Sequence, residues 1–148
     1  MDSIQNSDDE SKVLRLYTKL MRATNTVSEK MHKHLLDHKL SISQFGVLEA
    51  LYHLGPLCQK DLGNKILKTS GNLTMVIDNL EKRGLVRREK DSADRRRMVV
   101  KLTATGNTLI RDIFPKHSRI AQHVFSVLEP EEQESLGRLL KKLGINNK

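Results

Sequence analysis

The strongest chemical signal in the sequence is a basic stretch over residues 87–101. It holds seven Lys or Arg residues and three acids, so its net charge is +4. Three successive arginines follow Asp94. Guanidinium groups on a protruding loop fit the narrow minor groove of DNA, where the phosphates concentrate negative potential. A carboxylate among them weakens DNA binding unless it orients a guanidinium, so we expect Asp94 to hold Arg96 or a neighbour.

A second group of small polar residues opens a helix that the periodicity predicts over 70–83, with Thr69 or Ser70 as its N-cap. A helix that enters the major groove N-terminus first presents its first turn to base edges and its dipole to phosphate. An Asn72 amide can pair with adenine, and Thr74 or Met75 can contact a thymine methyl. The predicted DNA-contacting residues are Lys68, Thr69, Ser70, Gly71, Asn72, Thr74, Met75, Asp94, Arg95, Arg96 and Arg97.

Cys58 is the single cysteine and stands at the start of a short helix predicted over 59–67. A helix N-terminus makes a thiol more reactive, so Cys58 is a candidate redox sensor. The alternative is a small, partly buried thiol that happens to stand at a helix cap. Both interpretations stay open at this point.

Metal and catalytic signals are weak. His34 and His38 have the i, i+4 spacing of zinc ligands, but the only acid or thiol nearby is Asp37, so solvent-facing histidines are the favoured interpretation. The sequence has no G-x-S-x-G motif, no glycine-rich phosphate loop and no paired-carboxylate site. We therefore expect no metal, no cofactor and no enzymatic activity.

The elements that must position these residues are mostly helical. Apolar residues recur at helical spacing over 13–37, and Ser41 with Gln44 forms a capping box that starts a helix ending at Leu54. Two short strands follow the helix over 70–83. A long helix after Thr103 contains Pro115, which should kink or divide it, and a last helix starts near Pro130. The predicted strands and helices are 85–89, 98–102, 104–128 and 130–143.

The order helix, short helix, helix and charged hairpin describes a winged helix-turn-helix. The predicted fold class is therefore mainly α with a small β-hairpin wing and long terminal helices. Residues 1–10 carry four acids and no base, and we expect a flexible tail there. Residues 11–148 form a single domain, in which 41–106 is the winged part. The helices of 11–38 and 107–148 are longer than a small domain needs, which favours a role in dimerisation.

The composition of the chain limits the classes of molecule that it is expected to bind. The chain has 148 residues, a net charge of +8 and 37% hydrophobic residues, so it can bury a core and should bind a polyanion. Nucleic acid is the first candidate and an anionic membrane surface the second. Aromatic residues make up only 3%, which argues against single-strand stacking. We find no transmembrane run and no signal peptide, and one cysteine fits a reducing cytoplasm.

Several segments resemble the MarR family of bacterial transcription regulators. Residues 94–106 match every position of that family's wing signature, D-x-R-x-x-x-V-x-L-T-x-x-G. Residues 73–86 are similar to its recognition helix and turn, 43–48 to its second helix, and 128–132 to the start of its last helix. The resemblance covers nearly the whole chain after residue 12.

The resemblance implies a homodimer whose first and last helices intertwine and whose winged parts bind a pseudo-palindromic operator in double-stranded DNA. It also implies repression, which a small aromatic or phenolic compound or an oxidant relieves. Met75 stands where many members have Arg. Two alternatives stay open: a protein-interaction module that keeps the fold without operator binding, and a thiol-based repressor that works through Cys58.

Overall fold

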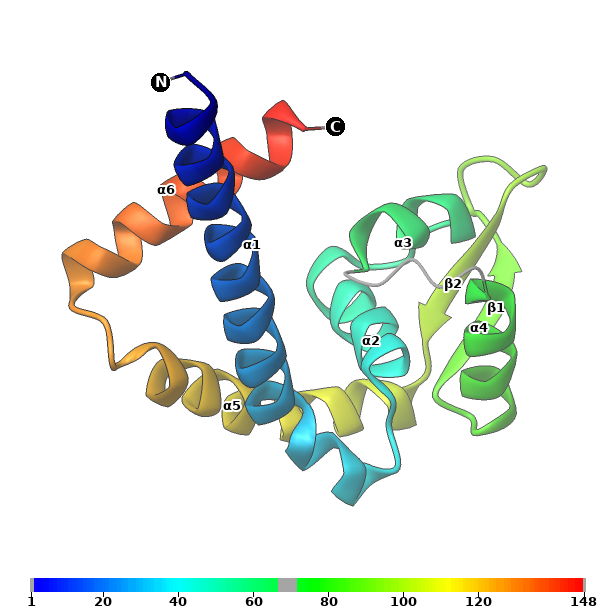
Figure 1. The fold of residues 1–148 in the computed structure, drawn as a ribbon. Helices are drawn as coiled ribbons and strands as arrows, with labels where there is room; N and C mark the ends of the chain where they lie inside the picture. The colour runs from blue at the N-terminus through cyan, green and yellow to red at the C-terminus, as the bar shows by residue number, and fades with distance from the viewer. Residues whose placement is uncertain (1, 67–71, 148) are drawn as a thin grey trace. The chain divides into compact units, whose positions relative to one another are not determined.

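The computed structural model describes residues 2–66 and 72–147 and is shown in Figure 1. Its elements in chain order are α1 (Asp2–His32), the 3₁₀ helix η1 (Lys33–His38), α2 (Ile42–Leu54), α3 (Gln59–Lys65), α4 (Leu73–Lys82), β1 (Val86–Lys90), β2 (Met98–Leu102), α5 (Ala104–Phe125) and α6 (Pro130–Asn146). The mainly helical fold with a two-stranded hairpin confirms the predicted class. The chain forms two compact units, which we call the winged unit (His34–Arg119) and the terminal-helix unit (the described residues of Met1–Lys33 and Ile120–Lys148).

Several helix boundaries differ from the prediction, as does the effect of Pro115. α1 already begins at Asp2, so the acidic segment that was expected to be a flexible tail is helical. The helix expected to reach Asp37 ends at His32 and continues as η1. α4 begins at Leu73 rather than at residue 70. Pro115 lies inside α5 without dividing it.

The core lies in the winged unit. Every buried side chain among the described residues belongs to it, and the most deeply buried come from α2, α3, α4 and α5: Leu48, Leu62, Ile77, Leu80 and Ile110. The predicted capping box starts α2, since Ser41 Oγ accepts from the Gln44 backbone at 3.1 Å and Gln44 Oε1 accepts from the Ser41 backbone at 2.9 Å. This cap fixes where the first helix of the motif begins.

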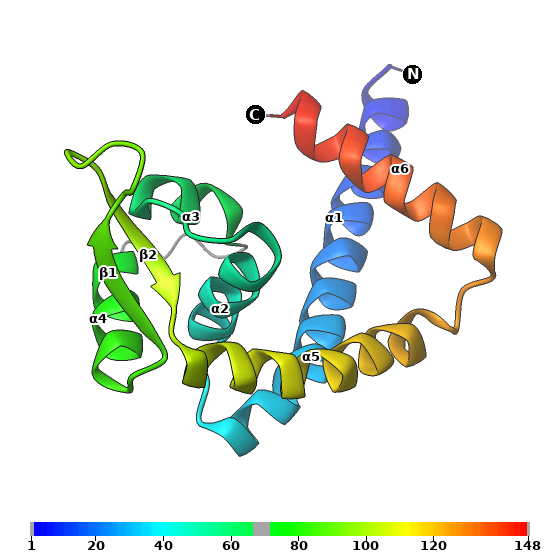
Figure 2. The same cartoon turned by 180° about the vertical axis from the view of Figure 1, so that it is seen from behind.

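The hairpin is antiparallel, with Arg88 opposite Val100, and an isolated bridge joins Val100 to Leu57 ahead of α3. Figure 2 shows β1 and β2 from behind, running beside α4 to a tip. The chain leaves β2 at Thr103, whose hydroxyl donates to the Gly84 carbonyl at 2.6 Å and accepts from the Gly106 backbone at 3.0 Å. A Cβ on Gly106 would lie 2.0 Å from the Leu85 carbonyl oxygen, so α5 can start only with a glycine there.

The terminal-helix unit exposes much of its apolar surface. On α1, Leu14 and Tyr17 are 67% and 61% exposed, and on α6 Leu139 and Leu143 are 51% and 50% exposed. These residues follow the helical spacing that normally marks a buried stripe. In the described part of the chain, no helix is both long enough and apolar enough to span a membrane.

The position of His34 differs from the one expected from the sequence. His34 and His38 are not one turn apart on an α helix, because residues 33–38 form a 3₁₀ helix. His34 is only 6% exposed, and its Nε2 lies 3.3 Å from Nδ1 of His117 on α5. The His117 ring also packs against Phe45 at a tilt of 51°, with ring centroids 4.6 Å apart. His34 therefore packs inside the winged unit instead of facing solvent.

Candidate nucleic-acid interface

The first turn of α4 is the first part of the candidate interface. Asn72, Thr74 and Met75 are all exposed, and the Met75 side chain is 62% exposed. Lys68, Thr69, Ser70 and Gly71, the other residues predicted for this end, lie outside the described residues. The structure therefore places three of the seven residues predicted here on one accessible helix start.

Asn72, and not Thr69 or Ser70, is the N-cap of α4. Its side chain makes no capping hydrogen bond, and its Nδ2 instead lies 3.7 Å from the Met75 sulfur. A sulfur is a weak acceptor, so this contact holds the amide only loosely. The Asn72 amide is thus accessible for a stronger partner, which is what recognition of a base edge requires.

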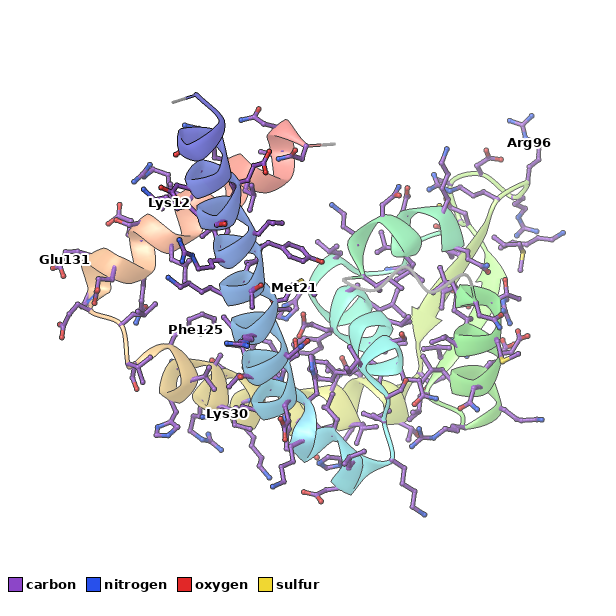
Figure 3. All side chains as sticks on the ribbon, viewed as in Figure 1. Lys12, Met21, Lys30, Arg96, Phe125 and Glu131 are labelled. Carbon is purple, nitrogen blue, oxygen red and sulfur yellow. The ribbon has the colours of Figure 1, made fainter. Side chains whose placement is uncertain are left out.

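The tip of the hairpin is the second part. Arg97 donates its backbone N–H to the Asp94 carbonyl at 3.0 Å and accepts from the Asp91 backbone at 2.8 Å, which closes the tip. Asp94 Oδ1 accepts from the Arg96 backbone N–H at 3.1 Å and from Arg96 Nε at 3.3 Å. The predicted contact between Asp94 and Arg96 is confirmed. The Arg96 side chain is 93% exposed and extends outward from the tip (Figure 3).

The other wing cations divide into paired and accessible groups. Arg88 donates to Glu81 at 2.9 Å and to Asp78 at 2.6 Å, both on α4. Arg87 lies 3.3 Å from Glu89. Arg95, which is exposed, forms no ion pair with another described residue. Arg95 and Arg96 are therefore the wing arginines accessible for binding, while Arg88 holds the hairpin to α4.

Arg97 was predicted to contact DNA, but its guanidinium is engaged with α3. Its Nη2 donates to Cys58 Sγ at 2.9 Å and to Asp61 Oδ2 at 2.8 Å. The hydrogen bond from Arg97 to Cys58, with further support from Asp61, raises the pKa of Arg97 above its ordinary value, so the group stays cationic. Arg97 thus ties the base of the wing tip to the helix-turn-helix.

Cys58 is the N-cap of α3, as predicted, but it makes no side-chain capping bond. It lines an open hollow of about 340 Å³ between α3 and the hairpin, together with Pro56, Asp61, Lys90 and Arg97. The thiol is partly buried and still borders a space that a small molecule can enter. The structure therefore leaves Cys58 accessible beside a fixed positive charge.

Sequence reasoning missed two residues that shape the interface, Gln59 and Arg88. Gln59 Nε2 donates to Thr74 Oγ1 at 2.6 Å, and Arg88 contacts the α4 residues Asp78 and Glu81. Both side chains reach partners that are distant in sequence, so no local spacing points to these pairs. The only available signal was the presence of polar residues at the edges of the predicted helices and strand.

Comparisons with known proteins agree with this architecture. The MarR family model matches residues 40–98. MhqR, an HTH-type transcriptional regulator of Bacillus subtilis (strain 168), is 39% identical over 137 residues, which are 93% of this chain and 94% of MhqR. YkoM of the same organism, described as an uncharacterized HTH-type transcriptional regulator, is 38% identical over 142 residues, which are 96% of this chain and 92% of YkoM.

A solved structure of BpsR from Bordetella bronchiseptica superposes with a TM-score of 0.76 at 31% sequence identity and covers 86% of this chain and 91% of BpsR. That study describes how 6-hydroxynicotinic acid regulates the DNA binding of BpsR. The exposed α4 start, the arginine wing and the extent of these matches lead to one conclusion: the chain belongs to the MarR family of transcriptional regulators.

Proposed function

We propose that this chain is a cytoplasmic, homodimeric repressor that binds a pseudo-palindromic operator and releases it when a small aromatic or phenolic compound binds. The observation that carries the proposal is the winged unit itself. It presents the exposed first turn of α4 and the exposed Arg96 of the wing from one folded core. A helix start suits the major groove, and an oriented arginine suits the adjacent minor groove.

Dimer formation is supported by the terminal-helix unit. Apolar residues on α1 and α6 are half exposed or more in the single chain, including Leu14, Tyr17, Leu139 and Leu143. Burial of such side chains is worth about 1.5–3 kcal/mol each, which favours a second copy as their partner. A two-fold dimer would present two winged units to two operator half-sites, as a palindrome requires.

The effector class is proposed from a relative. BpsR, whose DNA binding responds to 6-hydroxynicotinic acid, is 31% identical to this chain. An aromatic acid or phenol is therefore the first class of compound to test. A thermal-shift screen of aromatic acids, phenols and quinones measures this directly, because a ligand that prefers the native state raises the melting temperature.

The proposed function is tested by selecting operators from a pool of randomised DNA duplexes with the full chain, followed by footprinting. We expect a symmetric protected region and a steep loss of affinity with salt. Arg96→Ala should weaken operator binding by about 1–3 kcal/mol at fixed salt. Arg111→Ala, which removes an exposed arginine of α5 away from the wing tip, is the matched control and should change affinity little.

Two results would overturn this proposal. Equal operator affinity for Arg96→Ala and the parent would remove the wing from the mechanism. Protection of no DNA sequence by the parent would favour the rival function, a protein-interaction module that keeps the fold, for which the exposed Met75 on α4 is the motivation.

A second candidate function is a thiol-based repressor. The observation in its favour is the 2.9 Å contact between Cys58 Sγ and Arg97 Nη2 at the edge of a hollow that a small oxidant can enter. Oxidation of Cys58 would then weaken the tie between α3 and the wing. The test is operator release by peroxide or quinone in the parent and in Cys58→Ser. Equal release by both proteins excludes the thiol mechanism, and release by the parent alone supports it.

A further inference from the structure

We propose that Gln59 is a positioning residue. It determines whether the Thr74 hydroxyl donates or accepts a hydrogen bond toward DNA, and thereby which base α4 selects. This inference rests on the proposed operator binding. Gln59 is the first residue of α3, and its Nε2 donates to Thr74 Oγ1 at 2.6 Å. The bond joins α3 and α4, the two helices of the helix-turn-helix, at the exposed first turn of α4.

The contact is held by the packing around it. Leu62 of α3 is fully buried in the core, and a Cβ added to Gly63 would lie 3.5 Å from a methyl carbon of Leu73. The two helices therefore approach closely beside the bond. Gln59 is half-buried, whereas Thr74 is exposed. The donor is thus fixed by the protein core, and the acceptor stands at the surface where a ligand can reach it.

The chemistry of the two groups decides the direction of the remaining hydrogen bond. A side-chain amide nitrogen only donates, while a hydroxyl has one hydrogen and two lone pairs. Thr74 Oγ1 accepts from Gln59 and so directs a lone pair toward α3. Its own hydrogen cannot point at the Gln59 amide nitrogen and is directed away from it, so Thr74 can donate on its outward side.

No carbonyl of α4 takes that hydrogen by the usual helical route. Threonine hydroxyls inside helices commonly donate to the carbonyl four residues earlier. Thr18 and Thr24 of α1 do so, at 3.1 and 2.8 Å. Thr74 is the exposed second residue of α4, so no residue of α4 lies four positions before it. The Thr74 hydroxyl hydrogen therefore suits an acceptor on a bound DNA.

A donor at this place distinguishes bases. In the major groove guanine presents the acceptors N7 and O6 and thymine presents O4, whereas cytosine presents only its N4 amino donor. We infer that Thr74 favours guanine or thymine over cytosine at one position of each half-site. Gln59 acts through Thr74 and need not touch DNA itself.

The chain offers a matched control of the same chemistry. Gln44 of α2 donates from Nε2 to Asn79 Oδ1 of α4 at 2.9 Å, farther along the helix from its first turn. Asn79→Ala removes a glutamine-to-α4 bond of the same kind and leaves the Ser41–Gln44 capping box intact. It should leave base preference unchanged.

The experiment measures dissociation constants of the full chain for the selected operator and for every single base-pair substitution in one half-site, at fixed salt. The proteins are the parent, Thr74→Val, Gln59→Met, Gln59→Glu and Asn79→Ala. Ratios between operators are compared, because a uniform change in phosphate attraction cancels in them. Thermal unfolding of each protein confirms that it is folded.

We expect Thr74→Val to identify one base pair whose discrimination falls on the order of fivefold, and Gln59→Met to lower discrimination at the same pair. Gln59→Glu should invert the preference toward adenine or cytosine, because an ionised carboxylate accepts the Thr74 hydrogen and leaves lone pairs facing the base.

Other results would overturn the inference. If Gln59→Met and Gln59→Glu keep the parental base preference while Thr74→Val loses it, Gln59 does not set the polarity of Thr74. Loss of discrimination at the same pair in Asn79→Ala would show a general effect of α4 mobility instead. If the parent selects no operator at all, the proposed function fails, and this inference fails with it.

Discussion

The two units of the chain differ in where their apolar side chains lie. In the winged unit Leu48, Ile77 and Ile110 are fully buried, whereas in the terminal-helix unit Leu14 and Leu139 are 67% and 51% exposed. The same residue types at the same helical spacing thus complete a core in one unit and leave an open face in the other. The winged unit buries its apolar residues within one chain, and the terminal-helix unit presents an apolar surface that suits a partner.

The polar contacts show the same contrast. In the winged unit, side chains join elements that are distant in sequence, such as Arg97 to Asp61 and Gln44 to Asn79. In the described part of the terminal-helix unit, the side-chain hydrogen bonds span shorter stretches of sequence, from Thr18 to the Leu14 carbonyl up to Gln133 to the Phe125 carbonyl. Distant bonds fix the positions of elements far apart in the chain, while the shorter-range bonds support one helix or join two consecutive ones. The surface proposed to bind DNA therefore lies on the winged unit, where side-chain contacts between distant segments hold the elements in position.

The largest expected effect concerns the open face. Leu140→Asp places a charge on α6 where the leucine is 43% exposed in the single chain. In a two-fold dimer each substitution acts twice, so dimerisation should weaken by roughly 3 kcal/mol or more. Sedimentation analysis measures the dissociation constant. Ser135→Asp, at an exposed polar position of α6, is the control, and equal dimer stability in both variants would contradict the proposed interface.

A glycine in each unit gives the second prediction. Gly106→Ala should destabilise the chain by roughly 2–4 kcal/mol, because its Cβ would overlap the Leu85 carbonyl oxygen. Gly137→Ala on α6 meets no atom within 4 Å, and alanine is the better helix former, so it should stabilise by up to about 1 kcal/mol. Chemical denaturation measures both. Equal effects would contradict the difference in packing between the units.

Arg88 gives the third prediction. Arg88→Met removes the contacts to Asp78 and Glu81 and should destabilise the winged unit by about 1–2 kcal/mol, since the group is only 25% exposed. Arg87→Met is the neighbouring control, because Arg87 is 58% exposed and its one ion pair with a described residue is to Glu89 on its own strand. Thermal unfolding compares them. Equal melting temperatures would show that the tie between β1 and α4 adds nothing.

The smallest effect is expected at the wing tip. Asp94→Ala frees Arg96 from its carboxylate and should lower operator affinity by about threefold relative to Asp91→Ala. Both variants remove one negative charge from the wing, which by itself strengthens DNA binding. The difference between their dissociation constants therefore isolates the orientation of Arg96. Identical affinities would mean that Asp94 does not prepare the arginine.

Local signals predicted much of the fold. The Ser41–Gln44 capping box appears as expected, and Gly84 ends α4 with a left-handed backbone, φ +73°. The Asp94–Arg96 contact was also predictable, because the two residues are near neighbours and of opposite charge. Each of these depends on atoms a few residues apart, so sequence spacing alone defines them.

Other outcomes depended on distant neighbours. Arg97 was predicted to contact DNA, and the fold in addition places Cys58 and Asp61 beside its guanidinium. His34 was expected to face solvent, but η1 turns it into the interior against His117. The charge and type of these residues were plain in the sequence, while their partners come from other elements that only the packed chain brings near.

The sequence by itself determined the family, the helical order and the basic wing, because motifs and periodicity are local properties. The tertiary structure decided which arginines remain accessible, which hydroxyl faces outward and which glycine must lack a side chain. Those outcomes depend on contacts between segments far apart in the chain, such as Gln59 with Thr74 and Leu85 with Gly106. Such contacts form only when a shared core fixes the segments at hydrogen-bonding distance.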